Sequence, residues 1–388
     1  MDSNSKCTLE NKFNRVTRKN TAGNTNVLTI SAQHGLINQF EYYNNQYASE
    51  DTSGYTLLHK GDFAYNKSYS EGYPFGATKR LEHYESGIVS PLYICFVAKA
   101  GVCADFYSYY FESEPFYREI YRIAQEGARN HGLLNVPTDD FFKMKIADPP
   151  LAEQKRIAEI LKCCDQGIAL KKELLAEKKR QKKALMQKLL NPDSGFRLPG
   201  FAGKWRRNHL GNFIELISGV DLPTESLLTN DKYTPYLTGA SNIENNNLTL
   251  NRWVINPKNI ALRGDILIVC KGSGVGGMVI MNIPQAHIAR QFMAIRPSEE
   301  VVTIYIYYIL KDSLEKIKNK AQGLIVGIDR KAILKLNAAI PLRDEQQAIA
   351  DVLSTADKEI DLLEQELVQQ QQKKKSLMQL LLTGIVRV

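Results

Sequence analysis

Two short segments contain the residue types of known catalytic or cofactor-binding motifs. The first is DPPL at 148–151. In amino-methyltransferases, an acidic or amide residue binds the amino group of the target base, and an aromatic residue after the prolines stacks on the flipped base. Leu151 stands in the aromatic position, so the segment lacks the stacking surface. The sequence therefore favours a structural role for this segment, with base methylation as the less favoured alternative.

The second segment, GSGVGG at 272–277, has the spacing of a dinucleotide-binding glycine loop. That loop works only when a helix follows it, because the pyrophosphate binds at the helix N-terminus. Here MVIMNIP follows, which has the β-branched residues of a strand and ends at Pro284. We therefore expect a polar surface loop and no nucleotide site.

Other catalytic patterns are missing from the sequence. The histidines show no H-x-H or H-E-x-x-H spacing and the cysteines no C-x-x-C pair, so neither a metal centre nor a disulfide framework is expected. No G-x-x-x-x-G-K-[ST] segment is present, which excludes ATP-driven work by this chain. The sequence predicts a protein that is not an enzyme by itself and that binds no cofactor and no metal.

Polar loops with lysine or arginine are the candidate binding segments instead. Cations beside Asn, Gln, Ser and Tyr bind phosphates and can reach base edges. Two such loops end KGDFAYNKS at 60–68 and RGDILIVCKGS at 263–273, and their parallel positions support a shared role. An ordinary solvated loop is the alternative for any one residue. The candidate DNA-binding residues are Asn66, Lys67, Ser68, Tyr69, Tyr73, Lys79 and Arg80, followed by Asn242, Asn245, Lys271, Ser273, Arg290 and Gln291.

The composition is compatible with an anionic partner. Lysine and arginine number 50 against 42 aspartates and glutamates, a net charge of +8. Such an excess suits phosphates, although proteins that bind no anion also show it. The longest apolar run, VVTIYIYYIL at 301–310, is about half the length that spans a bilayer. The start of the sequence has no apolar segment of a signal peptide, so we expect a cytoplasmic protein.

A long duplication organises the chain. Residues 153–190 return as residues 345–382 at an offset of 192 without a gap, and sixteen of the 38 positions are identical. A Pro-Leu pair opens each copy, at 150–151 and 341–342, where a proline can begin a helix without losing a needed N–H. Chance does not produce such a match. The sequence therefore predicts two related halves, each a globular segment followed by a long helix.

The globular segments have diverged from one another but keep weak echoes, such as YSYY at 107–110 and YIYY at 305–308. Both mix short β-branched stretches with amphipathic ones. The fold class is therefore α/β (α+β), with two globular domains in tandem. The stretches that predict these elements are 27–31, 265–270 and 278–283 for strands, and 104–125 and 301–320 for helices.

Both duplicated segments have the 4-3 apolar spacing of a coiled-coil seam. The seams turn polar at the same places, Lys178 and Lys182 in the first helix and Gln370 and Lys374 in the second. Such shared breaks indicate one structural template used twice. The apolar seam residues are Ile157, Leu161, Ile168, Leu175, Leu185 and Leu189 in the first helix, and Ile349, Leu353, Ile360, Leu367, Leu377 and Leu381 in the second.

The charges of the two helices predict that they pair with each other. Residues 151–190 have eleven Lys/Arg and five Asp/Glu, a net +6, while residues 343–382 have five and eight, a net −3. Opposite net charge favours pairing between the helices over self-pairing. The expected arrangement is an antiparallel coiled coil with pseudo-two-fold symmetry, about 60 Å long. A coiled coil that joins two copies of the chain is the alternative.

The duplicated segments resemble those of the specificity subunit of type I restriction-modification systems. The residues that carry the resemblance are PLAEQKRIAEIL and KKALMQKLL within 150–190, and PLRDEQQAIADVL and KKSLMQLLLTG within 341–384. NVLTISAQHGLINQ at 26–39 and KGDFAYNKSYSEGYPFGATKR at 60–80 are similar to that family's first target-recognition domain. The resemblance extends over nearly the whole chain.

The resemblance implies a non-catalytic subunit with two target-recognition domains, each reading one half of a split site on double-stranded DNA. The helices would set the spacer and dock two methyltransferase subunits, and a restriction/translocase subunit would complete the complex. S-adenosylmethionine, ATP and Mg²⁺ would bind to those partners. The implied domains are 1–149 and 192–340, with a central helix at 150–191 and a C-terminal helix and tail at 341–388.

The start of the first globular segment departs from the repeat. The second segment opens with GKWRRNHLGNFIEL at 203–216, whereas the first has a shorter lead-in. We expect the opening strand of the first domain to be either truncated or completed by GIVRV at 384–388. Two other functions stay open from the sequence: a methyltransferase or nuclease-fused protein that acts alone, and a coiled-coil adaptor without DNA affinity.

Overall fold

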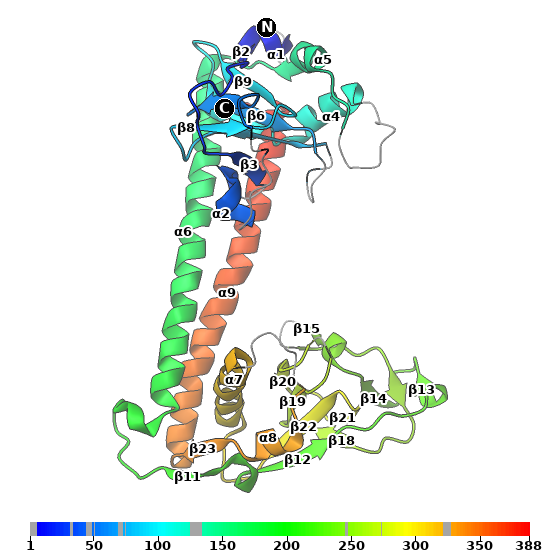
Figure 1. Cartoon of the computed structure of the whole chain (residues 1–388). Coiled ribbons are helices and arrows are strands. Elements are labelled where there is room, and N and C mark those ends of the chain that lie inside the picture. Colours follow the sequence, from blue (N-terminus) through cyan, green and yellow to red (C-terminus); the bar gives the residue numbers. More distant parts are fainter. Residues whose placement is uncertain are drawn as a thin grey trace. The chain divides into compact units, whose positions relative to one another are not determined.

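The chain divides into two compact units (Figure 1). The first comprises residues 1–172 and 365–388, and the second comprises residues 173–364. Each unit therefore contains one globular segment, part of the first long helix and part of the second. The structure is a computed structural model, and it describes residues 6–31, 34–43, 49, 51–68, 73, 75–124, 134–244, 247–272, 274–320 and 327–388.

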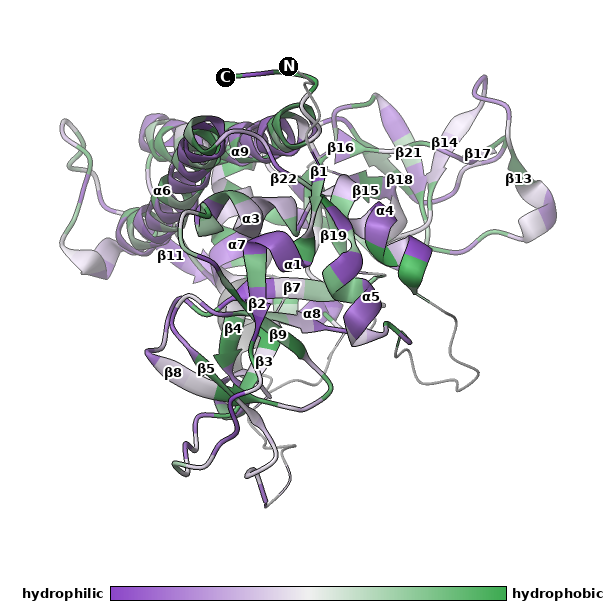
Figure 2. Cartoon of the chain, turned by 90° about the horizontal axis from the view of Figure 1, so that it is seen from above, coloured by the Kyte–Doolittle hydropathy of each residue, from purple (hydrophilic) through white to green (hydrophobic). Residues whose placement is uncertain are grey.

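The long helices are α6 (Leu151–Leu189) and α9 (Arg343–Leu382). Hydrophobic and hydrophilic residues alternate around both of them (Figure 2). All twelve apolar residues predicted for the seam are buried or partly buried. Ion pairs connect α6 with α9 inside each unit: Lys171 with Glu366 in the first, and Lys178 with Glu359 (2.5 Å) in the second. Over the described part of the chain, no helix is both long and apolar enough to cross a membrane.

The first unit is built on a four-stranded antiparallel sheet in the order β2-β9-β6-β7. Its strands are β2 (Phe13–Arg15), β6 (Phe63–Asn66), β7 (Ala77–Arg80) and β9 (Ile94–Ala98). The two-stranded ladders are β1 (Lys6–Thr8) with β10 (Lys145–Ala147), β3 (Leu28–Ser31) with β4 (Gly35–Asn38), and β5 (Thr56–His59) with β8 (Ser86–Val89). The shorter helices are α1 (Leu9–Lys12), α2 (Gln39–Tyr43), α3 (Ala104–Tyr110), α4 (Glu114–Ile123) and α5 (Thr138–Lys143).

The core of the first unit is aromatic. Phe63 stacks on Phe96 at 5.4 Å between ring centroids, and Phe13 packs edge-on against both. Aromatic pairs in such geometries add stabilisation beyond the area they bury. Residues of both long helices belong to the same cluster, among them Leu161 of α6 and Leu381 of α9. The globular segment and these two helix segments therefore form one hydrophobic core.

The second unit repeats the four-stranded sheet, in the order β12-β22-β19-β20. These strands are β12 (Ile214–Ser218), β19 (Ile266–Val269), β20 (Met278–Ile280) and β22 (Phe292–Pro297). A further sheet has the order β13-β17-β14-β21-β18, from β13 (Leu227–Leu228), β14 (Thr234–Leu237), β17 (Trp253–Val254), β18 (Ile260–Leu262) and β21 (Gln285–Ile288). The other strands and α-helices described in this unit are β11 (Arg206–His209), paired with β23 (Asn337–Ile340), β15 (Ile243–Glu244), paired with β16 (Asn247–Leu248), and the helices α7 (Thr303–Lys320) and α8 (Arg330–Leu334).

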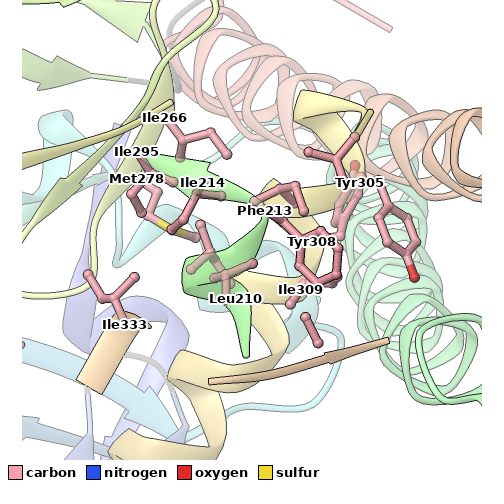
Figure 3. Close-up of a cluster of buried hydrophobic side chains, with 14 of the residues drawn as sticks. Leu210, Phe213, Ile214, Ile266, Met278, Ile295, Tyr305, Tyr308, Ile309 and Ile333 are labelled. Atoms are coloured by element: carbon pink, nitrogen blue, oxygen red, sulfur yellow. The ribbon is translucent and has the colours of Figure 1, made fainter. Parts of the chain in front are cut away.

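The largest apolar cluster of the second unit lies between its sheet and α7. Tyr305 and Ile309 of α7 and Phe213 before β12 are among its members (Figure 3). Leu189 of α6 and Leu353 of α9 are also buried in it. The second unit therefore uses the helices as the first unit does, with the roles of α6 and α9 exchanged.

The Gly-Asp turn before the central strand confirms that the two sheets are repeats. Asp62 accepts a hydrogen bond from the N–H of His59 (2.7 Å), and Asp265 accepts one from the N–H of Leu262 (2.8 Å). The preceding glycines, 61 and 264, have φ of 95° and 91°, a region that favours glycine. Each buried aspartate also pairs with an arginine: Arg18 in the first unit and Arg296 in the second.

Three details differ from the sequence expectations. The stretch 104–125 forms two helices, because Pro115 in the first turn of α4 cannot continue a helix from α3. The stretch 278–283 forms a strand only as far as Ile280. The opening strand of the first domain, β1, pairs with β10 as β11 pairs with β23, and the segment 384–388 forms no strand that completes it. As described, β1 has three residues and β11 has four.

The first turn of each long helix is tied to the globular segment by glutamine. Gln154 donates to the carbonyl of Pro149 (2.8 Å), and Gln346 donates to that of Pro341 (3.0 Å). The two glutamines and the two prolines share the offset of 192. The proline of the first copy that matches Pro341 is therefore Pro149, one residue before the Pro-Leu pair suggested by the sequence.

The preceding glutamates bind arginines from the segments that follow the opposite helix ends. In the second unit, Glu345 receives both Nε (2.8 Å) and Nη2 (2.6 Å) of Arg197. In the first unit, Glu153 receives Nη2 of Arg387 (2.6 Å). The segment 384–388 therefore supplies a side-chain contact, where the sequence allowed a strand.

Replacing Arg387 should destabilise the first unit. The Arg387→Ala variant leaves the carboxylate of Glu153, a buried residue, without the guanidinium that balances it, at an expected cost of about 1–3 kcal/mol. Arg118→Ala is the matched control, because Arg118 pairs with Glu114 while both side chains are more than half exposed, and such pairs contribute little. Hydrogen exchange in the first unit measures the difference. Equal protection in the two variants would contradict the assigned role of Arg387.

The stability of the second unit should fall at acidic pH. His287 is fully buried, accepts the N–H of Lys258 at Nδ1 (3.0 Å) and donates from Nε2 to the carbonyl of Val220 (2.8 Å), so the ring is neutral. Burial lowers its pKa below the ordinary 6.5, against the opposing effect of the Val220 carbonyl. The unfolded chain therefore takes up the proton first, and stability is lost as the pH falls below about 6.5.

Tryptophan fluorescence can follow this loss selectively. Both tryptophans, Trp205 and Trp253, lie in the second unit, so denaturant titrations at about pH 7.5 and 5.5 report on that unit alone. The His287→Asn variant is the control and should show a smaller difference between the two pH values. An equal difference in the variant would assign the pH dependence to other groups.

Candidate nucleic-acid interface

The turn after β6 holds several predicted residues of the first unit. Asn66 accepts a hydrogen bond from the N–H of Ser68 (3.0 Å), which fixes the start of the turn. Lys67 is partly buried, and burial together with the nearby Arg15 guanidinium lowers its pKa. Two neighbouring cations attract an anion. Tyr69, also predicted here, lies outside the described residues.

The structure brings Tyr73 and Lys79, two of the predicted DNA-binding residues, together. The ammonium of Lys79 lies 5.4 Å from the ring centroid of Tyr73 and forms an ion pair with Glu112. Burial acts to lower the pKa of Lys79, but Glu112 and Tyr73 outweigh it and raise the pKa. The side chain is 11% exposed. A phosphate would therefore have to displace Glu112 before it could bind this lysine.

Arg80, like Lys79, already forms ion pairs with carboxylates. Its Nη1 lies 2.7 Å from Asp105 and its Nη2 2.8 Å from Glu82. These side chains line a groove of about 950 Å³ in the first unit, which Lys162 of α6 also lines. The groove mixes both signs of charge, and its cations on β7 are already neutralised. Of the predicted residues of the first unit, Lys67 has a second cation, Arg15, near it. No pattern in the sequence pointed to Arg15, because it lies on another strand, β2.

Loops of the second unit meet beside the end of β19. Lys271 follows β19 and is exposed. The carboxamide of Gln291, in the turn between β21 and β22, lies against Gly239: a Cβ at this glycine would be 2.0 Å from Gln291 Oε1. Gly274 packs as closely on Ala240, since a Cβ at this position would lie 2.2 Å from the alanine Cβ. The Gln291 carboxamide could move aside but the alanine Cβ could not, so the approach at Gly274 requires glycine. Both contacts join loops that are distant in sequence.

Arg290 and Asn242 have different roles in this cluster. Arg290 has a side chain that is 73% exposed and pairs with Asp221 at the surface (2.8 Å). Asn242 is fully buried. It accepts the N–H of Thr238 (2.8 Å) and donates to the carbonyl of Thr249 (2.8 Å), so its side chain supports the loop and is enclosed in this structure. The other two predicted residues, 245 and 273, lie outside the described residues.

The two lysine loops are displaced by one residue relative to each other. When β6 and β19 are aligned on their shared Gly-Asp turns, Lys67 matches Cys270 and Ser68 matches Lys271. Cys270 is buried in the core cluster of the second unit. The parallel position expected from the sequence holds for the turns but not for the individual lysines.

The segments with motif-like spacing have structural roles. The glycine segment 272–277 is followed by strand β20, so no helix N-terminus is available for a pyrophosphate. Asp148 forms an ion pair with Lys12 (2.7 Å) directly before α6. Among the described residues, no three His, Cys, Asp or Glu side chains are grouped as metal ligands.

The sequence matches one family model twice. The model of the type I restriction modification DNA specificity domain matches residues 10–180 and again residues 203–370. Two relatives from Methanocaldococcus jannaschii are each 27% identical to the chain. They are a putative type I restriction enzyme MjaX specificity subunit, where 71% of this chain aligns with 69% of the relative, and the type I restriction enzyme MjaVIII specificity subunit, with 78% and 75%.

The fold is shared with a chain of a solved type I restriction-modification system, from work on its complex assembly and conformational transition. The TM-score is 0.67 over 98% of both chains, at 17% sequence identity. At this identity the likeness establishes the fold, while the family match carries the relationship.

Replacing Lys271 should weaken DNA binding and reduce its salt dependence. If Lys271 neutralises one phosphate, the Lys271→Ala variant lowers the slope of log K against log salt by about one. Lys331→Ala is the control, since Lys331 is an exposed lysine on α8, outside the loop cluster. Fluorescence anisotropy of the full complex over a salt series measures both slopes. An unchanged slope in Lys271→Ala would remove this residue from the interface.

Proposed function

The chain belongs to the type I restriction modification DNA specificity domain family, and from that premise we propose how its parts divide the work. Its relatives are specificity subunits, which makes this chain a non-catalytic component of a type I restriction-modification complex. The two alternatives, a methyltransferase acting alone and an adaptor without DNA affinity, are not favoured by the family relationship.

We infer that each unit reads one half of a split DNA site. The observation that carries this inference is the repetition of one sheet with the same strand order and the same buried Gly-Asp turn in both units. The framework is kept while the loops after β6 and β19 differ. Two different half-sites require that combination, because a common scaffold must present different side chains.

The residues proposed to contact DNA differ in whether their side chains are already bound to other groups of this chain. Lys67 with Arg15, and Lys271 with Gln291, would contact DNA directly, and Arg290 would do so after leaving Asp221. Asn66, Ser68 and Asn242 would hold the loops in place. Contacts by Tyr73, Lys79 and Arg80 require that the carboxylates beside β7 be displaced. We keep Tyr69, Asn245 and Ser273 as proposed contacts on the sequence alone.

The helices are proposed to form an antiparallel coiled coil that relates the two domains by a pseudo-two-fold axis and sets the spacer. The burial of the predicted seam and the Lys–Glu pairs between α6 and α9 support this arrangement. The division of labour would follow the expected segments: readers at 1–149 and 192–340, and helices at 150–191 and 341–388.

The partners are proposed from the same relationship. Two methyltransferase subunits would dock on the helices, and a restriction/translocase subunit would complete the complex. The partners would bind S-adenosylmethionine, ATP and Mg²⁺, while this chain would bind none of them. The complex would act on double-stranded DNA in the cytoplasm.

Mapping of methylated adenines tests the proposal. Co-expression of this chain with its methyltransferase subunit should methylate one split sequence, two short specific parts separated by unspecified bases. The methyltransferase without this chain should leave that sequence unmethylated. Methylation by the purified chain alone would support the solitary enzyme, and a continuous recognition sequence would contradict two separate readers.

A further inference from the structure

Each long helix has a lysine that is buried or partly buried where its apolar seam is interrupted: Lys182 is buried and Lys374 is partly buried. The side chain of Lys182 in α6 is 8% exposed and that of Lys374 in α9 is 19% exposed. Removing an ammonium group from water is costly unless an anion lies beside it. A leucine at either position would stabilise an apolar seam more. The two lysines therefore indicate a requirement other than stability.

In the first unit, the helices α3, α6 and α9 meet at Lys374. Asp165 of α6 accepts a hydrogen bond from the hydroxyl of Tyr109 in α3 (2.8 Å) and another from the ammonium of Lys374 in α9 (2.5 Å). The same ammonium lies 5.2 Å from the ring centroid of Tyr109. The tyrosine comes from the globular segment, so the cluster joins that segment to both helices at one point.

The second unit builds the same cluster with the helices exchanged. Asp357 of α9 accepts a hydrogen bond from the hydroxyl of Tyr308 in α7 (2.8 Å) and forms an ion pair with Lys182 of α6. The ammonium of Lys182 lies 5.5 Å from the ring centroid of Tyr308. A second lysine, Lys311, approaches Asp357 to 3.9 Å.

The aspartates and the lysines of the two clusters both obey the offset of 192, but the tyrosines do not. The sequence echo pairs Tyr109 with Tyr307 and Tyr110 with Tyr308. In the structure, Tyr308 takes the role of Tyr109. Tyr305, by contrast, keeps the role of Tyr107, since each donates to the carbonyl of an alanine at the offset of 192. The Tyr–Asp contact is therefore present in both units although the echo does not align its two tyrosines.

Resting on the proposed function, we propose that each Tyr–Asp–Lys cluster is a positioning site that fixes its DNA-reading domain on the helices. Together the two clusters would then set how strictly the spacer length is read. The apolar contacts beside each cluster hold the domain, but they are non-directional. A hydroxyl bonded to a carboxylate adds a direction, and the lysine holds that carboxylate in place.

The protonation states suit this role. Burial raises the pKa of both tyrosines, and the aspartate beside each adds to the rise. The hydroxyls therefore remain donors throughout the physiological range. Each Tyr–Asp–Lys set provides matched donors and acceptors within one unit, so a domain that tilts on its helices must break a charge-assisted hydrogen bond.

The test measures spacer discrimination by the full complex of this chain with its methyltransferase subunits. The substrates are duplexes with both half-sites and a spacer of native length, or one base pair shorter or longer. The Tyr109→Phe/Tyr308→Phe variant keeps the rings and removes only the two hydroxyls. Its ratio of kcat/KM for the native spacer to that for the altered spacers should fall at least about tenfold, the scale of one lost hydrogen bond to a charged group. The half-site sequences should not change.

The matched control removes two other hydroxyls from the same helices. Tyr107 and Tyr305 donate to the carbonyls of Ala147 (3.0 Å) and Ala339 (2.7 Å), inside the globular segments. The Tyr107→Phe/Tyr305→Phe variant should lower thermal stability but keep the spacer ratio. An unchanged ratio in the first variant, or an equal fall in both, would overturn the positioning role.

The two single variants are measured as well, in case the double variant assembles poorly with its partner subunits. Tyr109→Phe and Tyr308→Phe should each lower the ratio by an intermediate factor, and a complete absence of effect in both would also overturn the proposal. A wild-type complex that methylates no split site would instead refute the proposed function itself. The two failures are therefore distinguishable.

Discussion

Each globular segment shares its hydrophobic core with two helix segments that are distant in sequence. Leu161 and Leu381 are buried in the first core, and Leu189 and Leu353 in the second. Full burial of one such side chain contributes about 1.5–3 kcal/mol, so a globular segment cannot leave its helices without exposing part of its own core. In each unit, the globular segment that we propose to read DNA is consequently fixed to its segments of α6 and α9.

Apolar burial alone would leave the position of each segment loosely defined, and polar contacts supply the missing direction. Gln154 and Gln346 tie the first turns of the helices to the preceding strands, and the Tyr–Asp–Lys clusters hold the helices farther along. The glutamines, aspartates and lysines of these contacts recur in both units at the offset of the duplication, while the tyrosines do not. The loops that follow β6 and β19 differ in sequence between the two units.

The duplication and the apolar spacing of the helices were readable from the sequence because each is a pattern in the order of the residues themselves. Contacts between distant segments were not. Arg387 reaches Glu153 across 234 positions, and nothing near Arg387 predicts its partner. The burial of Asn242 and the carboxylates beside Lys79 and Arg80 likewise depend on packing. The candidate DNA-binding residues chosen from the sequence therefore included both side chains that hold the loops together, such as Asn242, and exposed side chains, such as Lys271.

The central claim is that the two units read separate halves of one DNA site. A combined Lys271→Ala/Arg290→Ala/Gln291→Ala variant tests it most directly, because all three residues belong to loops of the second unit. Methylated adenines would be mapped after co-expression with the methyltransferase subunit. The account predicts that one half of the recognised sequence becomes relaxed while the other half and the spacer stay unchanged. Relaxation of both halves, or of neither, would contradict it.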